Sequence, residues 1–129
     1  MKTIHIIQTA AVSGALAVIL GAFGAHGLEP MLEKTGRLAT YETAVSYHFY
    51  HSLALLMLGI LSANFPQINT FKQGAWLFIA GIIVFSGSLY VLSITGVTIL
   101  GAVTPFGGLA FILGWAWLFW GAAKIKSRS

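Results

Sequence analysis

The chain has 129 residues, of which 57% are hydrophobic and only 8% are charged, and its mean hydropathy is +0.87. A soluble domain carries about 25% charged residues, because its surface must face water. Seven basic and three acidic side chains cannot cover a soluble domain of this length, so we expect most of the surface to face lipid. Composition therefore predicts one all-α membrane domain over residues 1–129, with the lipid bilayer as its partner.

The formal net charge of +4 comes from cations at the ends of apolar segments rather than from a basic patch. Such a distribution is typical of membrane topology signals. It offers no surface that could release counterions from nucleic acid, so we expect no nucleic-acid partner. The absence of cysteine excludes a disulfide, a thiolate metal site and a cysteine nucleophile.

Four apolar segments are long enough to cross about 30 Å of hydrocarbon as α-helices. They cover about residues 4–25, 44–63, 74–94 and 106–123. The first has some features of a cleavable signal peptide, with Lys2 before an apolar run that ends in small residues. Its length favours a retained membrane helix.

Two connections outside these spans are informative. The first, 29–43, is the only long polar stretch, and it lies on the predicted outer side. Pro30 can open a short surface helix over 31–35 that Gly36 ends, and a partly ordered loop is the open alternative. The connection 95–105 carries no charge, so we expect it to stay close to the membrane or to pack against protein.

The orientation follows from the lysines and arginines near the span ends, because these residues are enriched on the cytoplasmic side. Five lie on one side of the predicted membrane: Lys2, Lys72, Lys124, Lys126 and Arg128. Two lie on the other, Lys34 and Arg37, in the connection that also holds Glu29, Glu33 and Glu42. This asymmetry predicts that both termini are cytoplasmic.

Small residues recur at intervals of seven positions in every span. The repeated residues are Gly14, Gly21, Ser52, Gly59, Gly74, Gly81, Ser88, Gly107, Gly114 and Gly121. Small residues allow the close backbone approach that drives helix association in lipid, and a seven-residue repeat keeps one stripe facing its partner. We therefore predict a left-handed bundle of four transmembrane helices with Gly/Ser/Ala interfaces, and we assign these glycines to helix packing.

The first span carries a second small stripe at four-residue spacing, made of Ser13, Ala17, Gly21 and Ala25. A helix with small residues on two faces can pack on two neighbours. One stripe is thus left for another subunit or another membrane protein. This predicts a homo-oligomer, with a different membrane protein as the other possible partner.

Four ionisable residues form a candidate intramembrane polar site: His26, Glu42, His48 and His51. His48 and His51 are three residues apart and so share one helix face, and His26 ends the first span on the same predicted side. Ionisable groups in membrane helices are costly and invite a functional hypothesis. Three interpretations stay open: structural or interfacial histidines, a proton or solute pathway, and a metal or haem site.

No motif typical of an enzyme appears. The chain has no nucleophile elbow, no phosphate-binding loop, no zinc-protease helix motif and no dinucleotide fingerprint. We expect a binding, transport-associated or organising role rather than catalysis. The alternatives are a small-solute or proton channel or transporter and a haem- or metal-bound redox protein; the cofactor is unknown.

Several motifs appear together in a fixed order. They are GAFGAHGL at 21–28, YHxxHxLA at 47–54, FSGSLY at 85–90, and TPxGG at 104–108 followed by GW at 114–115. With them the chain resembles the YgdD/YwdK-type family of small bacterial membrane proteins of unknown function, which is similar to eukaryotic transmembrane protein 256. The resemblance implies four membrane helices in a bacterial inner membrane and no established activity. It places His26 and His51 at motif positions, whereas relatives often carry glutamine at the position of His48.

Overall fold

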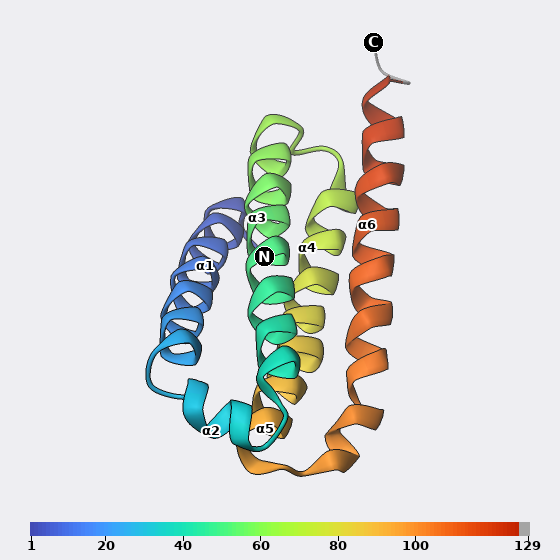
Figure 1. Ribbon diagram of the computed structural model, residues 1–129. Coiled ribbons are helices and arrows are strands. Elements are labelled where there is room, and N and C mark those ends of the chain that lie inside the picture. Colours follow the sequence, from blue (N-terminus) through green and yellow to red (C-terminus); the bar gives the residue numbers. More distant parts are fainter. Residues whose placement is uncertain (127–129) are drawn as a thin grey trace.

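The computed structural model describes residues 1–126, and helices occupy most of that length. The elements are α1 (Thr3–Ala25), α2 (Glu29–Lys34), α3 (Leu38–Asn64), α4 (Asn69–Gly81), η1 (Ile82–Ser86), α5 (Gly87–Thr95), η2 (Thr98–Ala102) and α6 (Thr104–Lys126). The π-helical turn η1 joins α4 to α5, so these three elements form one continuous rod, and η2 is a 3-10 turn. Figure 1 shows the long helices running alternately up and down.

The described residues contain four helices that are long and apolar enough to cross a membrane, which confirms the predicted all-α membrane fold. The second of them begins at Leu38, well ahead of the expected residue 44. The extra turn is held in place because the Tyr41 ring packs on Gly24 of α1 and its hydroxyl donates to the Leu20 carbonyl at 2.5 Å. A tertiary contact thus extends this helix beyond its apolar stretch.

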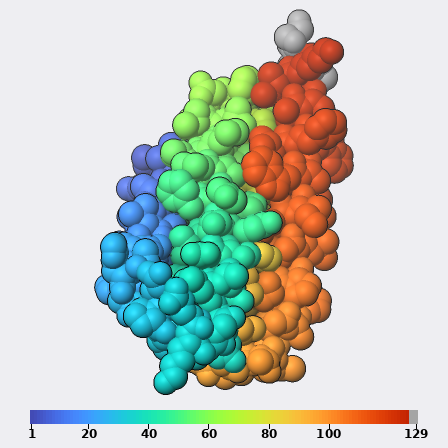
Figure 2. Space-filling model, viewed as in Figure 1, coloured from blue at the N-terminus to red at the C-terminus, as the bar shows by residue number. Residues whose placement is uncertain are grey.

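Helix α3 packs on α1 and on the α4–η1–α5 rod, the rod packs on α6, and α3 also touches α6 through His51. On the face drawn in Figure 2, α3 separates α1 from α6. The α3–α4 turn and the C-terminal end of α6 lie at one end of the bundle, whereas α2 and η2 lie at the opposite end (Figure 1). The arrangement places α1 at an edge.

The interface between the rod and α6 is built from phenylalanine rings seated on glycines. Phe71, Phe78 and Phe85 recur every seven residues along the rod, and they meet Gly121, Gly114 and Gly107 of α6. One pair is reversed, because Phe111 of α6 lies on Gly81 of the rod. At Gly107 the approach is closest, since an added Cβ would overlap the backbone of Phe85 itself.

Small residues also bring α1 and α3 together. An added Cβ on Gly14 would touch Ser52, one on Gly21 would touch Val45, and one on Gly59 would collide with Ile7. The second stripe of α1 faces the same helix: Ala17 is buried and Ser13 hydrogen-bonds to Ser52. Both small stripes are therefore largely used within one chain.

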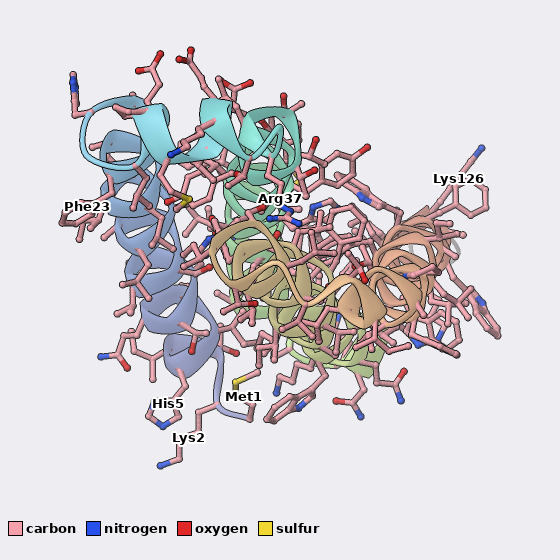
Figure 3. The ribbon with its side chains drawn as sticks, turned by 60° about the horizontal axis from the view of Figure 1, so that its bottom comes forward. Met1, Lys2, His5, Phe23, Arg37 and Lys126 are labelled. Carbon is pink, nitrogen blue, oxygen red and sulfur yellow. The ribbon has the colours of Figure 1, made fainter. Side chains whose placement is uncertain are left out.

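The ends that frame the bundle are set by a few local signals. Pro30 lies in the first turn of α2, and Gly36 follows that helix with a φ of +69°, as the short-helix alternative predicts. Gly96 ends α5 in the left-handed conformation, with a φ of +74°, and its N–H donates to the Leu92 carbonyl. The guanidinium of Arg37 lies against Gly96, so it points toward the bundle rather than away from it (Figure 3). Arg128 lies outside the described residues.

Candidate functional site

A groove of about 550 Å³ lies between α1 and the α4–η1–α5 rod, with α3 at its base. Its walls are aliphatic side chains, among them Val12 and Leu16 of α1 and Ile79, Ile82 and Ile83 of the rod. Val12 is 61% exposed and Ile83 is 67% exposed, so the groove opens sideways along the bundle. In a membrane this opening faces the hydrocarbon of the lipids.

Three polar side chains from three different spans lie together at the base of the groove. Nε2 of His48 is 3.1 Å from Oγ of Ser13, and Nδ1 of His48 is 3.0 Å from the Tyr90 hydroxyl. Ser13 Oγ is also 2.6 Å from Ser52 Oγ, whose hydroxyl donates to the His48 carbonyl at 2.7 Å. We call Ser13, His48, Ser52 and Tyr90 the groove network.

The direction of every hydrogen bond in the groove network follows from its last acceptor. The His48 carbonyl oxygen can only accept a hydrogen bond, so the Ser52 hydroxyl donates its one proton to it. Ser52 Oγ must therefore accept from the Ser13 hydroxyl. Ser13 must then accept from Nε2–H of His48. A neutral imidazole carries one N–H, which leaves Nδ1 bare to accept from the Tyr90 hydroxyl. A neutral His48 therefore carries its proton on Nε2.

The depth of the groove network makes these bonds important. Ser13 lies near the midpoint of α1, and Ser52 lies near the midpoint of α3. No water is present at that depth of a bilayer, and an unpaired polar group there costs several kcal/mol. The network therefore pairs its polar atoms internally and still lines an apolar groove.

His51 lies on the other side of α3 and takes part in helix packing. Its ring stacks on Phe111, with centroids 3.5 Å apart and an interplanar angle of 10°. Nδ1–H donates to the Tyr47 carbonyl at 2.8 Å, and Nε2 accepts from the Trp115 indole at 3.1 Å. Both ring nitrogens are occupied, so His51 is a neutral link between α3 and α6.

His48 and His51 contact different neighbouring helices because α3 is the central helix of the bundle. Residues three apart on an α-helix lie about 60° apart around its axis. On an edge helix both would face one neighbour, whereas on α3 that angle separates the groove from the α6 interface. His48 therefore contacts Ser13 and Tyr90, while His51 contacts Phe111 and Trp115.

His26 and Glu42 do not join either histidine. His26 is exposed and lines a shallow depression on α1 together with Phe23, whose ring points away from the bundle in Figure 3. Glu42 is exposed and lines a separate depression beside Gly24. Within residues 1–126, no group of three or more histidine, cysteine, aspartate or glutamate side chains could hold a metal ion.

The π turn η1 serves three surfaces at once. Ile82 and Ile83 line the groove, Phe85 meets Gly107 of α6, and the buried hydroxyl of Ser86 donates to the Ala44 carbonyl of α3 at 2.8 Å. A π turn is wider than an α turn and often marks a functional position in a helix. Here it lets one short segment contact α3 and α6 while it forms a groove wall.

The sequence held a weak signal for the groove network. Ser13, Ser52 and Tyr90 are polar residues inside apolar spans, but such hydroxyls usually bond to their own helix, as Ser93 does to the Leu89 carbonyl. Only the packing of α1 on α3 shows that Ser13 instead bonds to another span.

Comparison with known proteins agrees with this architecture. Residues 20–108 match the family described as "Protein of unknown function (DUF423)". The UPF0382 membrane protein YwdK of Bacillus subtilis (strain 168) is 46% identical over 114 residues, which cover 88% of this chain and 92% of that protein. The UPF0382 membrane protein SSP2132 of Staphylococcus saprophyticus is 48% identical over 115 residues, covering 89% and 93%. No solved structure matches the chain. This multi-pass membrane protein belongs to the DUF423 family, whose biochemical activity is unknown.

Proposed function

We propose that the chain is a membrane-embedded binding protein for an apolar molecule of the bilayer, which enters the groove sideways from the lipid. The observation that carries this proposal is an apolar groove of about 550 Å³ with a polar base near mid-membrane depth. Ligand sites typically have volumes of about 300–1,000 Å³, apolar walls and a few polar groups that set orientation. The groove has each of these properties.

The groove is open because the rod packs closely on α6 and not on α1. The rod packs tightly on α6 through rings seated on glycines, whereas its other face leaves space beside Gly87, where an added Cβ would meet no atom within 4 Å. Lipid gives no hydrophobic gain for closing such a space, so an occupant from the bilayer can fill it without competing against a large packing energy.

The channel, redox and catalytic alternatives have less support in the described residues. The groove network ends at the His48 carbonyl, which cannot pass a proton on. A metal or haem ligand would require His48 or His51 to give up a hydrogen bond inside the membrane. We therefore propose no transport, redox or catalytic activity.

The proposed location is the bacterial inner membrane, with both termini cytoplasmic. Lys2, Lys72, Lys124 and Lys126 belong to the same end of the antiparallel bundle. The second small stripe of α1 no longer supports a homo-oligomer, because Ser13, Ala17 and Gly21 face α3 of the same chain. We propose that a single chain binds the ligand, and the native mass of the protein gives the number of chains in the assembly.

Native mass spectrometry of protein released from mild detergent tests the binding function. We expect a reproducible added mass on the wild type and its loss in Gly87→Leu, which places a side chain in the groove from a position where an added Cβ meets no atom within 4 Å. Ala116→Leu is the matched control, because Ala116 is exposed on α6 and does not line the groove. Bare wild-type protein, or equal added mass on both variants, would contradict the proposal.

A further inference from the structure

We infer that the base of the groove selects apolar molecules that carry a hydrogen-bond donor, of the long-chain alcohol class, over ketones and ethers of the same shape. This inference rests on the binding function proposed above and names the chemistry of its ligand. It follows from the fixed direction of the groove network.

Every proton of the groove network is already committed within the protein. The Tyr90 hydroxyl donates to His48, His48 donates to Ser13, and Ser13 donates to Ser52. A hydroxyl oxygen has two acceptor lone pairs. Both lone pairs of Tyr90 remain unused by the network, and Ser13 keeps one. The groove network therefore offers acceptors and no donor, whereas the other polar side chains that line the groove, Gln8 and Thr9, lie on α1 ahead of Ser13.

The ligand must match that pattern because the surroundings are apolar. A ligand hydroxyl can donate to Tyr90 and so satisfy its own proton at mid-membrane depth. A ketone carbonyl or an ether oxygen can only accept, so its lone pairs would face those of the Tyr90 oxygen and no hydrogen bond would form. Hydrogen bonds inside membrane proteins contribute about 0.6 and at most about 1.7 kcal/mol, which corresponds to a preference of roughly three- to twentyfold.

The pattern would reverse only if His48 were charged. A protonated imidazole donates from both nitrogens, so Tyr90 would accept and could turn its proton into the groove. The side chains bonded to this ring are the hydroxyls of Ser13 and Tyr90, and neither carries a charge to balance an imidazolium. A lone charge at this depth is costly, so the neutral ring and a groove network that only accepts are the stable state.

Matched probes test the inference on the full chain in mild detergent. The probes are hexadecane, a hexadecanol with its hydroxyl at mid-chain, and the corresponding ketone, with bound fractions read by native mass spectrometry. We expect the wild type to prefer the alcohol over the ketone roughly three- to twentyfold. Tyr90→Phe bares Nδ1 of His48, which can also only accept, so this variant should keep a preference for the alcohol while binding hexadecane as before.

A second variant reverses the sign of the effect. His48→Leu removes the acceptor of the Tyr90 proton, which can then point into the groove, so the ketone should gain relative to the alcohol. Melting curves verify that both variants fold. Equal binding of alcohol and ketone to the wild type, or an unchanged preference in His48→Leu, would overturn the inference while the binding function stands. If none of the three probes binds, the binding function and the inference both fail.

Discussion

The third span meets α6 on one side and α1 on the other, and these two sides are packed in opposite ways. Toward α6, Phe71, Phe78 and Phe85 sit on glycines and the backbones come into contact at Gly107. Toward α1, aliphatic side chains face each other across a groove of about 550 Å³, and Gly87 has no neighbour for an added Cβ.

The difference shows that this sequence packs the rod closely on α6 and loosely on α1. Without a hydrophobic gain in lipid, helix association depends on van der Waals contact between small and large residues in register. Large and small residues face each other in register along the interface between the rod and α6, but not between the rod and α1. The tight side holds the fold, so the open side is free to bind.

The largest expected effect comes from the same small change on the two sides. Gly107→Ala places a Cβ against the backbone of Phe85, which cannot move aside as a side chain can, so we expect a loss of about 3 kcal/mol. Gly87→Ala adds the same atom in open space and should leave stability nearly unchanged. Melting curves by circular dichroism in mild detergent measure both. Equal melting temperatures for the two variants would break the comparison.

A smaller loss is expected where His51 links α3 to α6. His51→Leu leaves the Trp115 indole N–H without its acceptor, and an unpaired donor out of contact with water costs about 1–3 kcal/mol. Trp115→Phe removes the indole donor, so in the double variant the two losses should not add. Additive losses in this cycle would show that the hydrogen bond contributes nothing.

The smallest expected effect compares single hydroxyls on the two sides. Ser13→Ala removes two bonds from α1 to α3, to Ser52 and to His48, and Ser88→Ala removes a bond of 2.7 Å to Thr104 and a bond to the Phe85 carbonyl. Each lost hydrogen bond should lower stability by about 0.6 kcal/mol, the average for hydrogen bonds in membrane proteins. Similar small shifts in melting temperature would assign the difference between the sides to packing. A much larger loss in Ser13→Ala would place stability in the groove network instead.

Much of the fold was predictable from local patterns. Four apolar stretches, the small residues at seven-residue spacing and Pro30 before a short helix are each visible without tertiary information. The phenylalanines at 71, 78 and 85 follow the same spacing and mark the face of the rod that meets α6. The start of α3 at Leu38 is not predictable in this way, because it depends on Tyr41 packing against Gly24, which no local pattern contains.

The candidate site was predictable in residue type but not in arrangement. His48 is part of the groove, whereas His51 packs on Phe111, and His26 and Glu42 lie apart on the surface. Spacing along one helix indicates which residues share a face, but the neighbour on each face depends on the order of helices in the bundle. That order placed α3 in the middle and so divided the two histidines.

The occupancy of the groove is the central claim, and photocrosslinking in native membranes tests it most directly. A photoreactive leucine in place of Leu16 lies in the groove wall without filling the groove, and the same residue in place of Leu109 faces bulk lipid, because Leu109 is 53% exposed on α6. We expect one dominant adduct mass at position 16, distinct from the mixed bilayer lipids captured at position 109. The same mixture at both positions would contradict it.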